Sequence, residues 1–259
     1  MIALSWCWLR AGERRMLIGF VSAKGSPGVT TAVLALAAAW PRTAIVIDAD
    51  PAGGDVAAGL GRGAWPPASQ LLELAVQSRM TTVENALRRL VVRSAEHTPL
   101  ALAGLGSPVQ AATMPWRELG LGLAGIVDAD VLCDGGRYVH GEHGNMDLLR
   151  ACDRLVLVTG SSLPSVRATA RLAEVLHVLM DGPTPTLLVI DPGHPYDPID
   201  IRASCGGDGI VELPHDPRTA GVWSHGDAPG RHLDRTPLQR SARRVAAVLA
   251  SAGTAEVTS

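Results

Sequence analysis

The sequence of 259 residues predicts an α/β domain with a doubly wound, mostly parallel sheet between two layers of helices. Short apolar segments alternate along the chain with longer amphipathic segments. Several of the apolar segments are continuous, as in strands that are buried on both faces. Hydrophobic residues make up 47% of the chain and charged residues 19%, which is typical of a folded globular protein.

The elements follow in chain order from this alternation. Strands are expected over residues 17–21, 44–47, 100–103, 126–133, 155–159, 187–190 and 209–213. Helices are expected over residues 30–39, 69–78, 82–94, 115–123, 146–151, 164–180, 198–205 and 237–251. Thr81, followed three residues later by Glu84, predicts a capping box at the start of the third helix.

One domain is expected over residues 16–251, because no linker or repeat divides the chain. Residues 1–15 are interpreted as an extension or a mis-called start, and residues 252–259 as a disordered tail. The apolar stretch at residues 2–9 precedes its arginines, whereas a secretory signal has the opposite order. The longest apolar run, residues 32–40, has about half the length of a membrane span.

The net charge and the spacing of the cysteines argue against some classes of protein. The formal net charge of −2 argues against a strongly basic nucleic-acid coat protein. The four cysteines lie far apart in the sequence, which favours reduced thiols in a cytoplasmic protein over disulfides or a zinc site. Lys24 is the single lysine among the 23 basic residues.

That lysine lies in a glycine-rich segment between the first strand and the first helix, where residues 20–31 read F-V-S-A-K-G-S-P-G-V-T-T. The phosphate-loop pattern is G-x-x-x-x-G-K-[ST]. Ala23 takes the place of the first glycine and Val29 that of the lysine, so the strict pattern fails, although Gly28 and Thr30 match it. Taken alone, the segment leaves a nucleotide site and an ordinary turn as equal alternatives.

Acidic residues at the ends of two further strands favour the nucleotide site. Asp48 and Asp50 follow the second strand, and Asp134 follows the fourth. Ligands of open parallel sheets bind beyond the carboxyl ends of the strands, so these carboxylates are expected to point toward the glycine-rich segment. Two acids one residue apart suit the ligation of metal-bound water and the orientation of an attacking water.

With these motifs in order, residues 16–250 resemble the ParA/MinD family of deviant-Walker ATPases. The family loop reads K-G-G-x-G-K-[ST]-T, and residues 24–31 read K-G-S-P-G-V-T-T. Residues 48–54 are similar to the family's D-x-D-P-Q-G-N segment, and residues 151–159 to its strand after the Walker B acid. Residues 213–217 resemble the late loop that lies against adenine. The resemblance implies the P-loop NTPase fold of the ParA/MinD type.

The resemblance also implies ATP and Mg²⁺ as cofactors and assigns roles to the matching residues. Lys24, Asp50 and Asp48 take the catalytic positions, Lys24 as the signature lysine that reaches the partner's phosphates in an ATP-dependent sandwich homodimer. The residues expected to bind Mg²⁺ are Thr30, Asp50 and the Walker B acid Asp134. The nucleotide-binding positions are Ala23, Lys24, Gly25, Ser26, Gly28, Val29, Thr30, Thr31, Pro214 and Asp216.

Val29 departs from the family pattern, because valine cannot neutralise phosphate as the family's second lysine does. Pro27 also removes one backbone N–H from the loop. Two hypotheses follow. The first is a slowly hydrolysing, ATP-switched dimer that positions a cargo such as DNA, division proteins or a pilus or secretion apparatus. The second is a non-hydrolysing scaffold of the same fold that recruits protein partners. No substrate-specific motif indicates a metabolic enzyme of a related fold.

Other features favour structural interpretations. In the last predicted helix Leu238, Ala242, Val245 and Leu249 share one face, and Arg240, Arg243 and Arg244 lie opposite. We favour a helix packed on the sheet with a solvated basic face; DNA contact is the next alternative, ahead of weak membrane contact. His140 and His143 are expected to be solvated rather than metal ligands. Packing residues are expected at Cys133, Trp40, Trp65, Trp116 and Trp223.

Overall fold

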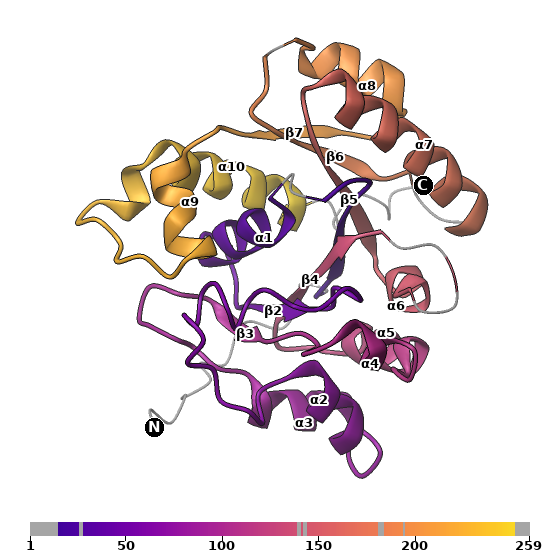
Figure 1. Ribbon diagram of the computed structural model, residues 1–259, viewed down its shortest axis with the longest axis vertical. Coiled ribbons are helices and arrows are strands. Elements are labelled where there is room, and N and C mark those ends of the chain that lie inside the picture. The colour runs from indigo at the N-terminus through magenta and orange to yellow at the C-terminus, as the bar shows by residue number, and fades with distance from the viewer. Residues whose placement is uncertain are drawn as a thin grey trace, which may run out of the picture.

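The computed structural model describes residues 15–25, 28–138, 141, 144–180, 184–193 and 195–251. Its seven strands form one parallel sheet in the order β3-β2-β4-β1-β5-β6-β7, with helices on both sides (Figure 1). The strands are β1 (Leu17–Ser22), β2 (Ala44–Asp48), β3 (Leu100–Leu102), β4 (Asp130–Arg137), β5 (Arg154–Gly160), β6 (Thr186–Ile190) and β7 (Ile210–Leu213).

The helices divide between the two faces of the sheet. One face is covered by α1 (Val29–Ala38), α9 (Pro217–Ser224) and α10 (Pro237–Ser251), whose buried side chains form one hydrophobic cluster with the sheet. The buried side chains of the remaining helices form the cluster on the other face. These helices are α2 (Leu71–Gln77), α3 (Val83–Leu90), α4 (Pro108–Ala111), α5 (Trp116–Ala124), α6 (Met146–Arg150), α7 (Leu163–Met180) and α8 (Pro198–Cys205).

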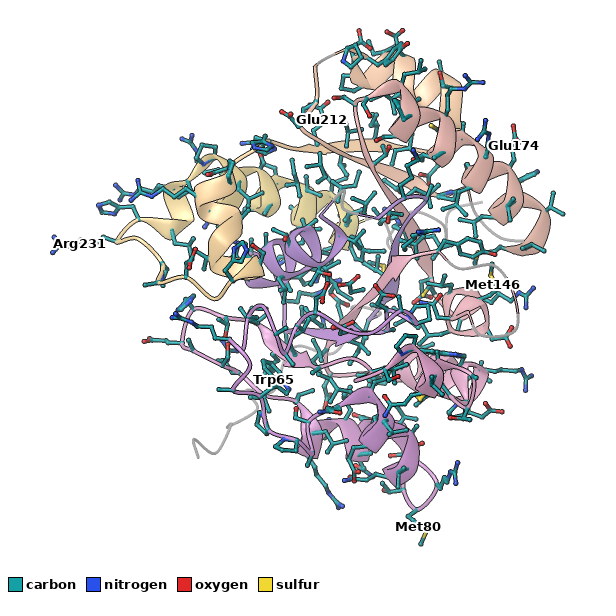
Figure 2. All side chains as sticks on the ribbon, viewed as in Figure 1. Trp65, Met80, Met146, Glu174, Glu212 and Arg231 are labelled. Atoms are coloured by element: carbon teal, nitrogen blue, oxygen red, sulfur yellow. The ribbon has the colours of Figure 1, made fainter. Side chains whose placement is uncertain are left out.

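Residues of β1 alternate between the two clusters. Ile18 and Phe20 pack on the α1 side, whereas Leu17 and Val21 pack on the opposite side. Because both faces are buried, every residue of the strand is buried, which explains the continuous apolar run in its sequence. The predicted three-layer α/β class is therefore confirmed. Exposed side chains such as Met80 and Arg231 project away from this body (Figure 2).

All seven predicted strands and all eight predicted helices are present, with some shifted boundaries. The strand expected over residues 126–133 starts later, at Asp130, and continues to Arg137. The third helix ends at Leu90 rather than residue 94, because Val92 leaves it to pair antiparallel with Ala101 beside the edge strand. The predicted cap is also wrong by one residue, since the Thr82 side chain, not that of Thr81, accepts from the Asn85 N–H.

The last helix packs as favoured. Leu238, Ala242, Val245 and Leu249 are buried against α1 and β7, so this face is not available to a membrane. On the other side of the helix Arg240, Arg243, Arg244 and Val248 are exposed. Within the described residues, no helix is both long and apolar enough to cross a membrane. Cys133 and the tryptophans expected to pack, Trp40, Trp65, Trp116 and Trp223, are buried. His140 and His143 lie outside the described residues.

Candidate functional site

The carboxyl ends of β1, β2 and β4 meet at one edge of the sheet, next to the first turn of α1. A cavity of about 710 Å³ opens there. It is lined from four segments, by Ser22, Gly25, Gly28, Val29, Thr30, Thr31, Asp50, Asp55, Ala58, Gly59, Gly136, Arg137, Trp223, Ser224 and His225. The glycine-rich loop and Asp50 therefore face the same space, as the strand topology predicts.

The loop after β1 is hydrogen-bonded to the sheet at its start and leads into α1 at its end. Ser22 Oγ donates to the carbonyl oxygen of Lys24 at 2.8 Å and contacts that of Gly136 at 3.4 Å. Gly28 has a φ of +86°, in the left-handed region that favours glycine, and lies at the N-cap of α1. The first backbone N–H groups of a helix lack intrahelical acceptors, so this turn offers donors to an anion in the cavity. Ser26 and Pro27, between these anchors, lie outside the described residues.

Asp50 is half-buried at the cavity wall. Its carboxylate accepts from the Ala52 N–H at 2.7 Å. Burial, together with the carboxylate of Asp55, raises the pKa of Asp50, and the Ala52 N–H opposes the rise. Gly136, with a φ of +60°, lies directly against Asp50, and a Cβ at this position would overlap the Asp50 carboxylate. Only glycine therefore allows β4 to approach Asp50 this closely.

Asp134 is buried beneath the cavity, inside β4 rather than beyond its end. One carboxylate oxygen, Oδ1, accepts from the Gly136 N–H at 2.9 Å, whereas Oδ2 has no hydrogen-bond partner in the described part of the chain. Burial raises the pKa of Asp134 to about 6, against the lowering effect of the Thr30 hydroxyl and the Gly136 N–H. A buried carboxylate oxygen without a donor, beside a hydroxyl, fits a bound cation.

Asp48 has a different position from the one its motif suggests. It pairs with Asp134 in the parallel register of β2 and β4, so the two carboxyl groups are neighbours on the α1 face. Asp48 is buried and accepts from the N–H groups of Val56 at 3.1 Å and Asp50 at 3.4 Å. Burial and then the Asp134 charge raise the pKa of Asp48 well above its ordinary value. Asp48 therefore holds the loop that carries Asp50 and does not line the cavity.

Lys24 and the late loop also lie away from the main cavity. Lys24 is exposed and lines a separate cavity of about 210 Å³ beside β5 and α7, with Gly25 shared between the two cavities. Ala23 packs against the hydrophobic cluster on the far face. Neither Pro214 nor Asp216 lines the 710 Å³ cavity. Asp216 instead caps α9, where its carboxylate accepts from the N–H of Thr219 at 3.1 Å and from its hydroxyl at 2.7 Å.

Val29 lies in the first turn of α1 with 6% of its surface exposed. It belongs to the same hydrophobic cluster as Phe20 and Trp223. The position that matches the family's second lysine is therefore part of the packed interior and contributes no charge to the cavity.

Nine residues of the cavity wall were not among the site residues expected from the sequence, and they include four with charged or ring side chains, Asp55, Arg137, Trp223 and His225. Asp55 closes the D-x-D segment, and Arg137 follows the Asp-Gly-Gly sequence of β4, so each adjoined a recognised motif. Trp223 and His225 come from the end of α9, a helix that was not predicted. Its start carries a signal, because Asp216 at the N-cap is followed by Pro217 at the first helical position.

The residues present fit a magnesium nucleotide better than a metal held by protein alone. In the part of the chain that the structure describes, no three His, Cys, Asp or Glu side chains gather into a set that could hold a metal ion. Mg²⁺ at nucleotide sites keeps several water and phosphate ligands and needs only one or two protein oxygens. The Thr30 hydroxyl and Asp134 Oδ2 provide such a pair below the cavity.

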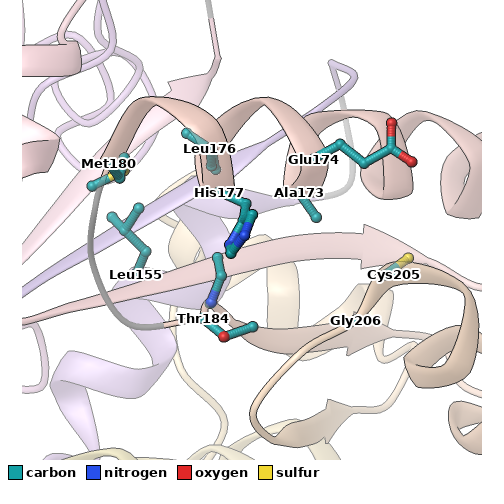
Figure 3. Close-up of a pocket in the computed structure, with 10 residues that line it drawn as sticks. Leu155, Ala173, Glu174, Leu176, His177, Met180, Thr184, Cys205 and Gly206 are labelled. Atoms are coloured by element: carbon teal, nitrogen blue, oxygen red, sulfur yellow. The ribbon is translucent and has the colours of Figure 1, made fainter.

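Another cavity, of about 290 Å³, lies between α7, β5 and the start of β6 (Figure 3). His177 projects from α7 toward Thr184 in this cavity, and Cys205 lies at its side (Figure 3). None of the residues at the carboxyl edge of β1, β2 and β4 lines it. It is separate from the candidate site.

Comparison with known proteins identifies the fold. No protein-family model and no curated protein matches the sequence. Among solved structures, a ParA family ATPase from Chlorobium tepidum TLS superposes with a TM-score of 0.70 at 17% identity, covering 91% of this chain and 98% of that chain. The MinD cell division protein of Aquifex aeolicus gives a TM-score of 0.70 at 16% identity, covering 94% and 100%.

A variant of Cyanothece McdA in complex with ATP gives a TM-score of 0.65 at 15% identity, covering 96% of this chain and 100% of that chain. These matches extend over nearly the whole of each chain. The chain therefore has the P-loop fold of the ParA and MinD ATPases.

Proposed function

We propose that this protein is an ATP-binding, ATP-switched dimeric ATPase with slow hydrolysis that positions or assembles a cellular cargo. The observation that carries the proposal is the cavity at the carboxyl edge of the sheet. The first turn of α1 and the Asp50 carboxylate line it, and Asp134, inside β4, is buried beneath it. The solved structures of this fold include MinD with Mg-ADP from Pyrococcus horikoshii and McdA with ATP, which supports the same ligand here.

In this proposal the N–H groups at the start of α1 bind the phosphates. The Thr30 hydroxyl and Asp134 hold Mg²⁺, which when bound would neutralise charge on the phosphate oxygens. Asp50, which lines the cavity, orients the attacking water. Asp48 fixes the loop from Asp50 to Val56 from below.

Val29 supports slow turnover. A cation positioned at the transferred phosphate contributes several kcal/mol of transition-state stabilisation, about 3 kcal/mol or more. The valine is buried in the α1 cluster and contributes none of it. The same observation favours the second candidate function, a scaffold of this fold that binds nucleotide without hydrolysing it and recruits protein partners.

Lys24 is proposed to act across a homodimer. It is exposed and lies outside the cavity that contains Asp50, so its ammonium group is available to a second copy of the chain. In a nucleotide-dependent sandwich this lysine would reach the partner's phosphates.

The proposal also concerns the partners of the protein and its location in the cell. A protein cargo or regulator is expected, and the exposed arginines of α10 leave non-specific DNA as an alternative partner. Cys133, Cys152 and Cys205 are free thiols, which agrees with a reducing cytoplasmic location.

The decisive experiment measures ATP affinity, ATP hydrolysis and molecular mass, with and without Mg-ATP, for the wild type, Lys24→Ala and Asp50→Ala. We expect micromolar to millimolar binding, ATP-dependent dimerisation that Lys24→Ala abolishes, and slow hydrolysis that Asp50→Ala abolishes without loss of binding. Absence of ATP binding at millimolar concentration with Mg²⁺ would contradict the proposal. Binding without hydrolysis, in a dimer indifferent to ATP, would favour the scaffold.

A further inference from the structure

The cavity at the carboxyl edge carries more negative than positive charge. Asp50 and Asp55 line it, and Asp134 lies beneath. A nucleotide adds further negative charge. Mg²⁺ offsets part of this charge, but in P-loop ATPases a side-chain cation also contacts the phosphates. Val29 cannot provide that contact, and Lys24 lines the neighbouring cavity.

Arg137 is the one arginine or lysine that lines the cavity among the residues described by the structure. It is the last residue of β4, three residues after Asp134, and its side chain is exposed. Guanidinium groups keep their charge at all physiological pH values and bind phosphate through two parallel N–H donors.

The backbone of Arg137 is fixed next to the phosphate loop. It pairs with Ser22 at the end of β1, after a shift in register between Phe20 and Ser22. The following N–H, of Tyr138, donates to the Ser22 carbonyl oxygen at 2.8 Å. Ser22 is in turn bonded to the start of the loop through the Lys24 carbonyl oxygen. The base of the Arg137 side chain is thus anchored to the strand from which the loop emerges.

The guanidinium of Arg137 is unpaired among the residues that the structure describes. No ion pair or side-chain hydrogen bond of Arg137 is found in the described part of the chain, although Asp50 and Asp55 line the same cavity. By contrast, Arg42, Arg88 and Arg150 each form an ion pair with a carboxylate. The group is therefore available to an anion that enters the cavity.

We propose that Arg137 supplies, from within the same subunit, the side-chain cation for the nucleotide's phosphates that Val29 does not supply. The inference rests on the proposed nucleotide function and adds a phosphate-binding residue to it. The cation comes from the end of β4 instead of the first turn of α1, and approaches the phosphates from the side of the Asp134 strand.

The test is calorimetric titration of the full-length protein with ATP and with adenosine, each with Mg²⁺, for the wild type, Arg137→Gln and Arg137→Lys. Arg240→Gln is the matched control, because Arg240 is an exposed arginine of α10 that does not line the cavity. We expect Arg137→Gln to weaken ATP binding about 10- to 100-fold, the usual worth of a charged hydrogen bond. Arg137→Lys should retain part of the affinity, and adenosine binding should not change.

Thermal unfolding without ligand provides the structural control, and Arg137→Gln should unfold within about 1 °C of the wild type because the side chain is exposed. ATP affinity of Arg137→Gln within twofold of the wild type would overturn the inference and leave the proposed function intact. Equal weakening by Arg240→Gln would also overturn it, since the effect would then be one of net charge. A wild type that binds no ATP at all would end both the proposed function and this inference.

Discussion

Asp130 and Asp134 lie on the same strand, β4, and the side chains of both are buried, but their surroundings differ. Asp130, at the amino end, accepts from the Met16 N–H at 3.0 Å and from Trp40 Nε1 at 2.7 Å. It also pairs with the Arg42 guanidinium at 2.6 Å. Asp134, near the carboxyl end, accepts from one N–H and has Asp48 as its neighbour on β2.

The difference separates a carboxylate that stabilises the fold from one that we propose binds a metal ion. A buried charge is tolerated when donors and an opposite charge surround it, as they surround Asp130. Asp134 keeps one oxygen without a donor and lies beside a second carboxyl group, and its pKa rises to about 6 through burial. Such a site lowers the stability of the ligand-free fold and gains most when a cation binds.

The largest effect is expected at the amino end. Asp130→Ala should lower the free energy of unfolding by about 3–5 kcal/mol, because Arg42 and Trp40 would lose their buried partner. Urea denaturation followed by circular dichroism measures the change. Asp147→Ala is the control, since its ion pair with Arg150 is exposed and should contribute less than about 1 kcal/mol. If Asp130→Ala lowers the free energy of unfolding no more than Asp147→Ala does, Asp130 does not stabilise the fold in the way proposed.

At the carboxyl end of β4, removing the carboxylate is expected to raise the free energy of unfolding instead of lowering it. Asp134→Asn keeps an acceptor for the Gly136 N–H but removes the buried charge. Without Mg²⁺ and nucleotide, it should raise the free energy of unfolding at pH 7.5 by about 1–3 kcal/mol. The same variant should lose Mg²⁺-dependent ATP binding, because the proposed metal ligand is gone.

The pH dependence of this gain follows from the direction of the pKa shift. The folded-state pKa of Asp134, about 6, is above the ordinary value of 3.8, so the folded state holds the proton more tightly than the unfolded state. The wild type therefore loses stability, relative to Asp134→Asn, as the pH rises from about 4 through about 6. Unfolding in urea at pH 4 and at pH 7.5 should show equal stability at the lower pH and the full difference at the higher. A difference independent of pH would contradict the assignment to a titrating carboxyl group.

Most of the fold could be predicted from the sequence because each central strand is apolar on both faces. The elements that were missed are short helices. Pro108–Ala111 is a single turn, too short for an apolar period, whereas Pro217–Ser224 is as long as some helices that were predicted; each begins with proline after a capping side chain. The early end of α3 depends on Val92 pairing with Ala101, a contact across the edge of the sheet that no local pattern contains.

The candidate site could be predicted in its parts but not in its assembly. The motif positions suggested that Thr30, Asp50 and Asp134 share one edge of the sheet, and in the structure Thr30 and Asp50 line the cavity there while Asp134 lies beneath, near Thr30. The pattern could not show which of Asp48 and Asp50 faces the cavity, because this depends on the hydrogen bond that the Val56 N–H donates to Asp48. Nor could it show that Arg137 shares the cavity with the phosphate loop, since their proximity arises from the pairing of β1 with β4.

The smallest expected effect compares two buried tryptophans, one bonded to Asp130 and one at the wall of the cavity at the carboxyl edge of the sheet. Trp40 Nε1 donates to Asp130, whereas Trp223 Nε1 is buried without a partner in the described residues. Replacement by phenylalanine removes the same ring atoms from each, so the difference between the two variants isolates the hydrogen bond. Trp40→Phe should cost about 1–2 kcal/mol more than Trp223→Phe in urea unfolding. Equal costs would mean that the Trp40 hydrogen bond contributes nothing to the stability of the Asp130 site, and its contrast with Asp134 would then depend on Arg42 and the Met16 N–H.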